Sequence, residues 1–145
     1  MSKILIVDDA HIMRKNLKTI LSETGHTIVA EAANGIQACM EYKKHLPDLV
    51  TLDITMPLMN GVDALKKIIA EFPAARIVIV SCTNNNKVIL EAIQCGAANY
   101  VLKPFTVEKV IHVVNQVLEI NEQVSQETID RIYRALNSPY LYSTH

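Results

Sequence analysis

Short apolar runs alternate with longer amphipathic segments along this chain, and that alternation limits the possible folds more than any other feature. Five runs rich in Ile, Val and Leu are predicted to be strands: Ile4 to Val7, Thr27 to Ala30, Leu49 to Leu52, Ile77 to Val80 and Tyr100 to Leu102. The first and fourth runs are apolar at every position, as in parallel strands that are covered on both faces. The pattern therefore predicts a doubly wound α/β sandwich.

The segments between these runs carry apolar residues at helical spacing. The expected apolar stripes are Ile12, Leu17, Ile20 and Leu21; Ile36, Cys39 and Met40; Val62, Leu65, Ile68 and Ile69; and Val88, Ile89, Ala92 and Ile93. Gly25 and Gly96 are expected to end helices, and Asn34 with Gly35 to open the second one. A further stripe between Val107 and Leu118 predicts a long helix that packs back on the sheet.

The sequence divides into a domain over residues 1–120 and a C-terminal helical extension and tail over residues 121–145. Ser125 can cap a helix that ends at Asn137-Ser138-Pro139 and presents an apolar face made of Ile129, Ile132, Tyr133 and Leu136. A helix this short is marginal in water, so its apolar face must pack against something. The candidates are its own domain, a second copy of the chain in a homodimer, and a target protein.

Composition and charge exclude several classes of function. The net charge is -1, with 14 Lys and Arg against 15 Asp and Glu, so nucleic acid is not an expected direct partner. The first apolar run is too short for a signal peptide, and no stretch is long enough for membrane insertion. The three cysteines form no Cys-x-x-Cys pair, which is typical of reduced thiols. A cytoplasmic protein is expected.

Acidic residues follow two of the predicted strands: Asp8 and Asp9 follow the first, and Asp53 the third. Because ligands bind beyond the carboxyl ends of such strands, we expect these residues to meet at one edge of the sheet, together with Ser81 and Lys103. Three crowded carboxylates repel one another unless a cation neutralises them. Ligands that are all oxygen favour Mg²⁺, and Mn²⁺ could substitute.

Beside such an ion, the Asp53 carboxylate can attack a phosphoryl group and form an acyl phosphate. Lys103 offers a compact positive charge to the phosphate oxygens, and Ser81 offers a hydroxyl. Taken singly, an Asp-Asp pair is usually a helix cap beside a solvated acid, and Lys103 a surface charge. Only their combination indicates a phosphorylation site.

These residues resemble those of the response-regulator receiver family, and most closely its stand-alone chemotaxis-type members. The resemblance covers roughly residues 1 to 120 and is carried by Ile4-Leu5-Ile6-Val7-Asp8-Asp9, Asp53-Ile54-Thr55-Met56-Pro57, Asn60-Gly61, Ser81, Tyr100 and Lys103-Pro104-Phe105. It implies a flavodoxin-like fold, with a five-stranded parallel sheet in the order 2-1-3-4-5 and helices on both faces.

The resemblance also implies a function. Asp53 would be the phosphoacceptor, assisted by Lys103 and Ser81, and would receive its phosphoryl group from a histidine kinase. The implied metal ligands are Asp8, Asp9, Asp53 and the backbone carbonyl of Thr55. Phosphorylation would switch the affinity for a downstream protein target. Such a protein is not an enzyme beyond Mg²⁺-dependent self-phosphorylation and slow autodephosphorylation.

Ser81 and Tyr100 are the implied switch residues: Ser81 moves toward the phosphoryl group and Tyr100 turns inward, which gives two arrangements biased by one new charge. The family also has a cis peptide bond before the proline that matches Pro104. Thr55 and Thr83 stand where the family tunes its dephosphorylation rate, and neither side chain is an acid or amide suited to orient water. Slow loss of the phosphoryl group is therefore expected.

Two other functions remain open. A phosphohydrolase that forms an aspartyl phosphate is the main alternative, but it would want an acid two residues after the nucleophile, where this chain has Thr55. A flavin carrier of the same architecture would want a phosphate loop rich in Ser, Thr and Gly after the first strand. Asp8 and Asp9 stand there instead and would repel phosphate.

Overall fold

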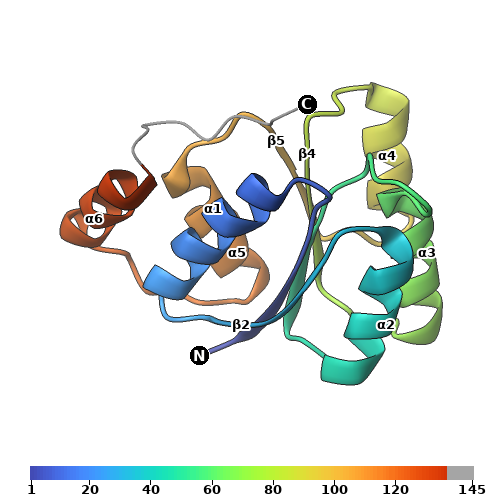
Figure 1. Ribbon diagram of the computed structural model, residues 1–145, viewed down its shortest axis with the longest axis horizontal. Coiled ribbons are helices and arrows are strands. Elements are labelled where there is room, and N and C mark those ends of the chain that lie inside the picture. The colour runs from blue at the N-terminus through green and yellow to red at the C-terminus, as the bar shows by residue number, and fades with distance from the viewer. Residues whose placement is uncertain (137–145) are drawn as a thin grey trace.

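A parallel sheet lies between two layers of helices (Figure 1). The computed structural model describes residues 1–136. Its strands are β1 (Lys3–Val7), β2 (Thr27–Ala32), β3 (Leu49–Leu52), β4 (Ile77–Ser81) and β5 (Asn99–Leu102). Its helices are α1 (His11–Glu23), α2 (Gly35–His45), α3 (Gly61–Glu71), α4 (Asn86–Gln94), α5 (Val107–Val117) and α6 (Gln126–Leu136). All five predicted strands are present, with ends that differ from the prediction by at most two residues.

The sheet has the order β2-β1-β3-β4-β5, and all of its strand pairs are parallel, as predicted. Val7, the last residue of β1, is paired with Leu52, the last residue of β3. Parallel strands in this register end at the same edge, so the residues that follow them lie together. The two all-apolar runs lie in β1 and β4, which together with β3 form the interior of the sheet, where helices cover both faces.

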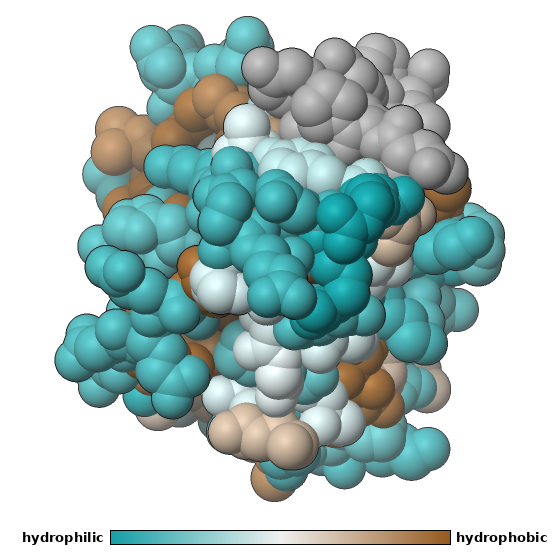
Figure 2. Space-filling model, turned by 90° about the vertical axis from the view of Figure 1, so that its left-hand side faces the viewer, coloured by the Kyte–Doolittle hydropathy of each residue, from teal (hydrophilic) through white to brown (hydrophobic). Residues whose placement is uncertain are grey.

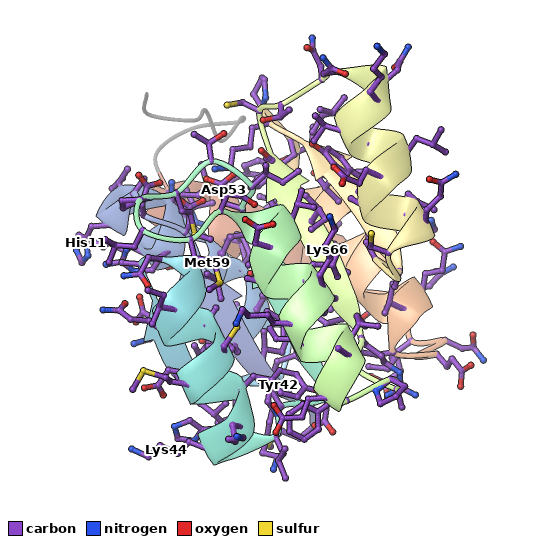
Figure 3. The ribbon with its side chains drawn as sticks, turned by 90° about the vertical axis from the view of Figure 1, so that its right-hand side faces the viewer. His11, Tyr42, Lys44, Asp53, Met59 and Lys66 are labelled. Carbon is purple, nitrogen blue, oxygen red and sulfur yellow. The ribbon has the colours of Figure 1, made fainter. Side chains whose placement is uncertain are left out.

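Each face of the sheet has its own hydrophobic core. One core joins α1, α5 and α6 to the sheet and includes Ile4, Leu17, Val101 and Val110. The other joins α2, α3 and α4 to the opposite face and includes Leu5, Leu52 and Leu65. At the end of the second core that lies away from Asp53, the rings of Tyr42 and Phe72 pack with centroids 5.0 Å apart (Figure 3).

Three of the predicted helix stripes were wrong in part. The residues found exposed instead are Ile12 (43%), Ile36 (44%), Met40 (65%) and Ile93 (43%). In α2 the buried face is formed by Gly35, Ala38 and Tyr42, one residue out of phase with the prediction. A small residue is needed at the start of this face because the start of α2 lies against the loop after β3. A Cβ on Gly35 would come within 2.5 Å of the Met59 backbone oxygen in that loop.

The C-terminal helix α6 begins as predicted, since the Thr128 amide donates to Ser125 Oγ at 3.2 Å. Its apolar face packs on its own domain: Ile132 is fully buried in the core of α1 and α5, and Ile129, Tyr133 and Leu136 pack against that core. Homodimerisation through this helix stays a prediction. The predicted helix end at Asn137-Ser138-Pro139 lies outside the described residues.

The side of the molecule that carries α6 is mainly hydrophilic where it faces the viewer in Figure 2. This agrees with the sequence of α6, in which Gln, Glu, Asp and Arg occupy most positions outside the apolar face. Over residues 1–136, no helix combines the length and the apolar character needed to cross a membrane.

Candidate functional site

The acidic pair after β1 lies at the edge where the strands end. The Asp8 amide continues the sheet by donating to the Ala32 carbonyl at 3.0 Å, and the Asp8 carboxylate is only 1% exposed. Its Oδ1 accepts a hydrogen bond from the Ala10 amide at 2.9 Å. Helix α1 starts at His11 without a side-chain cap, so neither Asp8 nor the exposed Asp9 serves as its N-cap.

Asp53 follows β3, and backbone groups of neighbouring residues hold both its amide and its carboxylate. Its amide donates to the Val7 carbonyl at 3.0 Å, and its carboxylate Oδ1 accepts from the Ile54 amide at 2.8 Å. Gly61, at the start of α3, packs so closely that a Cβ there would lie 2.0 Å from the Asp53 carbonyl oxygen. The predicted Asn60-Gly61 pair therefore lets α3 approach the phosphoacceptor candidate. Figure 3 shows Asp53 at this end of the sheet, under the loop to α3.

Lys103 reaches into the acidic cluster from the end of β5. Its Nζ lies 2.7 Å from Asp8 Oδ2 and 3.6 Å from Asp53 Oδ2, and all three side chains are at most 8% exposed. Carboxylate oxygens of Asp8, Asp9 and Asp53 lie within 4.8 Å of one another. The predicted meeting of these four residues at one edge of the sheet is thus present in the structure.

The charges of this cluster do not balance. Burial raises the pKa of Asp53 above its ordinary value, the Lys103 charge acts in the opposite direction, and the charge of Asp8 adds to the rise. The cluster holds three carboxylates, and Lys103 pairs with two of them, Asp8 and Asp53, so a net negative charge is left at the edge of the sheet. Oxygen ligands around uncompensated negative charge suit a hard divalent cation such as Mg²⁺, and the residues present therefore fit the predicted metal.

Hydroxyl groups connect the ends of β3, β4 and β5. Ser81 Oγ, fully buried, donates to Thr83 Oγ1 at 3.3 Å, and Thr83 Oγ1 lies 3.5 Å from Thr55 Oγ1. The Tyr100 hydroxyl donates to the Thr83 carbonyl at 2.6 Å. Burial raises the pKa of Tyr100, so this hydroxyl stays protonated and remains a donor at neutral pH. Thr83 thus links the two predicted switch residues.

A family model for the response regulator receiver domain matches residues 4–115 of this sequence. The chain belongs to the response-regulator receiver family. The match covers the five strands, apart from Lys3 at the start of β1, and the helices α1 to α4, and it ends within α5. Helix α6 lies beyond it.

Several receiver relatives are similar over most of their own length. The chain is 47% identical to the chemotaxis protein CheY of Bacillus subtilis over 116 residues, which are 80% of this chain and 97% of that protein. It is 44% identical to CheY of Thermotoga maritima over 79% of this chain and 96% of that protein. These values confirm the predicted resemblance to chemotaxis-type receivers.

Solved receiver structures agree with the fold. CheY in a CheX-CheY-BeF₃-Mg²⁺ complex from Borrelia burgdorferi superposes with a TM-score of 0.78 at 35% identity, over 79% of this chain and 87% of that one. A LuxR-family two-component response regulator from Aurantimonas gives a TM-score of 0.79 at 27% identity, over 95% of this chain and 99% of that one. The flavodoxin-like topology predicted from the sequence is confirmed.

The receiver residues named from the sequence lie together, while their individual roles stay predictions. Asp8, Asp9, Asp53, Ser81 and Lys103 share one edge, and the Lys103–Pro104 peptide bond is cis, as the resemblance implied. Thr55 lies on the loop two residues after Asp53, and metal binding through its backbone carbonyl stays a prediction.

One residue of this site was not identified from the sequence. Arg14 on α1 donates from Nη1 to the Asp8 carbonyl at 2.7 Å and from Nε to Glu31 Oε1 at 3.2 Å. It ties the turn after β1 to the edge strand β2. In the sequence Arg14 is one of several charged residues on an amphipathic helix, and nothing in its spacing marks it as part of the site.

Proposed function

We propose that this receiver accepts a phosphoryl group on Asp53 from a histidine kinase and thereby changes its affinity for a protein target. The observation that carries the proposal is the position of Lys103 Nζ, 2.7 Å from Asp8 and 3.6 Å from Asp53 in a buried acidic cluster. A lysine beside a carboxylate nucleophile can neutralise the phosphoryl oxygens as they arrive.

The proposed cofactor is Mg²⁺, with Mn²⁺ as a substitute, held by Asp8, Asp9, Asp53 and the backbone carbonyl of Thr55. When bound, the ion neutralises negative charge on the phosphoryl oxygens. The Borrelia burgdorferi complex combines Mg²⁺ and BeF₃ with a CheY protein, which supports this choice. The unbalanced charge of the three carboxylates supports it independently.

The two oxygens of Asp53 have different surroundings. Oδ1 accepts a hydrogen bond from the Ile54 amide, whereas Oδ2 faces Lys103. We therefore assign the attack to Oδ2. Its lone pair forms the new bond to phosphorus while the bond from phosphorus to the donor's imidazole nitrogen breaks, and the imidazole keeps that electron pair. Lys103 and the hydroxyl of Ser81 would then contact the transferred oxygens.

The expected response starts at Ser81. A new anionic group on Asp53 offers a stronger acceptor to the Ser81 hydroxyl than Thr83 Oγ1, to which it donates at 3.3 Å. The Tyr100 hydroxyl is hydrogen-bonded to the backbone carbonyl of Thr83, so a movement of Ser81 that displaces Thr83 would be transmitted to β5. The protein target would distinguish the two arrangements. CheX in the Borrelia burgdorferi complex is an example of a protein bound to a relative.

The proposed activity is a single modification and not multiple turnover. The phosphohydrolase alternative would need an acid or amide close to Asp53 to activate water. Thr55 and Thr83, whose hydroxyls lie 3.5 Å apart beside the site, are neither. We therefore expect self-phosphorylation from small donors and slow autodephosphorylation.

Labelling with radioactive acetyl phosphate tests the proposal. Wild type should take up one phosphoryl group with Mg²⁺ and none with a chelator. Asp53→Asn should take up none under either condition. Asp63→Asn is the matched control, because Asp63 is an exposed acid in the first turn of α3 outside the cluster, and it should behave as wild type. Equal labelling of Asp53→Asn and wild type, or labelling without a divalent ion, would contradict the proposal.

A further inference from the structure

Helix α6 is an addition to the receiver core that packs as part of it. The family model ends at residue 115, and a relative matched over 97% of its own length covers only 80% of this chain. Yet Ile132 of α6 is fully buried in the core that joins α1 and α5 to the sheet. The helix is therefore placed to influence elements that lie within the family match.

Tyr133 makes polar contacts between α6 and the start of α5. Its hydroxyl accepts a hydrogen bond from the Val107 amide at 3.2 Å and donates to the carboxylate of Glu108. The first amides of a helix have no partner within the helix. Thr106 caps α5 by accepting from the Lys109 amide, and Tyr133 satisfies the amide of Val107. The first turn of α5 is thus held from outside by α6.

That first turn is directly connected to the candidate phosphorylation site. Val107 follows Lys103 by four residues, and Phe105 between them is only 4% exposed and packs in the same core as Ile132. The connection is a packed segment and not a loose loop, so a shift of the first turn of α5 displaces the backbone that carries Lys103.

We propose that Tyr133 is a positioning residue for phosphoryl binding: by holding the first turn of α5, it favours the placement of Lys103 beside Asp8 and Asp53. The proposal rests on the proposed function, since it assumes that Lys103 contacts the phosphoryl oxygens. Because phosphoryl binding and the docking of α6 are thermodynamically linked, each affects the other by the same factor. If docked α6 favours phosphoryl binding, a bound phosphoryl group tightens the docking of α6 by the same factor.

The test compares two variants of the full chain with wild type. Tyr133→Phe keeps the ring and removes the hydroxyl. Arg131→Gln is the matched control, because Arg131 pairs with Glu23 on α1 at 3.0 Å, so its loss weakens α6 docking without touching α5. The readout is the dissociation constant of beryllofluoride, an analogue of the phosphoryl group, in saturating Mg²⁺, measured from amide NMR shifts. Thermal unfolding of each variant reports any general loss of stability.

We expect Tyr133→Phe to weaken beryllofluoride binding about threefold, and by no more than about tenfold, the limit reached if the whole free energy of the lost hydrogen bonds favours the bound arrangement. Arg131→Gln should stay within about twofold of wild type, as for an exposed ion pair. In wild type, beryllofluoride should also slow amide exchange in α6, and in Tyr133→Phe this slowing should shrink.

Equal affinities in wild type and Tyr133→Phe, or equal weakening in both variants, would overturn the positioning role and leave α6 a packing element, while the proposed function stands. If wild type itself fails to bind beryllofluoride with Mg²⁺, the proposed function fails and the positioning role with it.

Discussion

Replacing Ile132 by alanine measures how far α6 belongs to the folded core. The Ile132 side chain is fully buried between α6 and the core of α1 and α5. Substitution of a buried isoleucine by alanine costs about 2–5 kcal/mol, and the cost falls where neighbours can close the cavity. Because α6 is an outer helix that can settle inward, we expect about 2–3 kcal/mol, in the lower half of that range.

The matched control is Ile36→Ala, the same substitution on another helix. Ile36 is 44% exposed, so its truncation removes little buried surface, and the higher helix propensity of alanine offsets part of the loss. We expect less than about 1 kcal/mol. The assay is urea unfolding of both variants and wild type, supported by thermal unfolding, in which 1 kcal/mol corresponds to about 3 °C for a chain of this length.

A clear difference between the two variants supports a docked α6. Equal and small losses for Ile132→Ala and Ile36→Ala would refute the reasoning, because a side chain that costs nothing to remove is not buried in a core. In Ile132→Ala, the free energy of unfolding could also fall less steeply with urea concentration while the midpoint stays unchanged. That result would count against a docked α6, because it would indicate that the helix unfolds separately from the domain.

Three further predictions concern other parts of the molecule. Gly61→Ala should lower stability by more than about 1 kcal/mol and abolish acetyl phosphate labelling, since a Cβ 2.0 Å from the Asp53 carbonyl must displace the backbone; urea unfolding and labelling measure both. Burial lowers the pKa of His26, so its stabilising contribution is present above the ordinary histidine pKa of about 6.5 and is lost as pH falls below it. Unfolding from neutral to mildly acid pH should therefore show a smaller loss of stability in His26→Leu than in wild type. Thr83→Glu should lose its radiolabel faster than wild type, because a carboxylate beside Ser81 can orient attacking water; equal decay would contradict that reasoning.

The strands of the sheet and the residues at its functional edge could be predicted because both follow from short patterns of neighbouring residues in the sequence. Runs of β-branched residues identify buried parallel strands, and parallel strands bring the residues after their ends to one edge. Asp8, Asp53 and Lys103 were therefore found together without knowledge of any distance. The strand order could be predicted only from the resemblance to the receiver family, because the local periodicity of a sequence does not show which distant strands pair.

Features that depend on close packing between distant segments were not predictable. The buried face of α2 is set by how closely Gly35 approaches the loop after β3, which a count of apolar residues misses. The contacts of Arg14 with Asp8 and Glu31, and of Tyr133 with Val107, depend on how separate elements pack in space. The apolar face of α6 was identified from the sequence, but its packing against its own domain, with Ile132 in the core of α1 and α5, was not.

Chemical mapping of the acyl phosphate identifies the phosphorylated residue. Borohydride reduces an aspartyl phosphate to homoserine, which mass spectrometry of peptides locates. After incubation with acetyl phosphate and Mg²⁺, homoserine is expected at position 53 alone, because Asp53 Oδ2 faces Lys103 while Asp8 already pairs closely with that lysine. Homoserine at Asp8 or Asp9, or no homoserine in protein that is fully folded and saturated with Mg²⁺, would contradict the assignment of Asp53 as the phosphoacceptor.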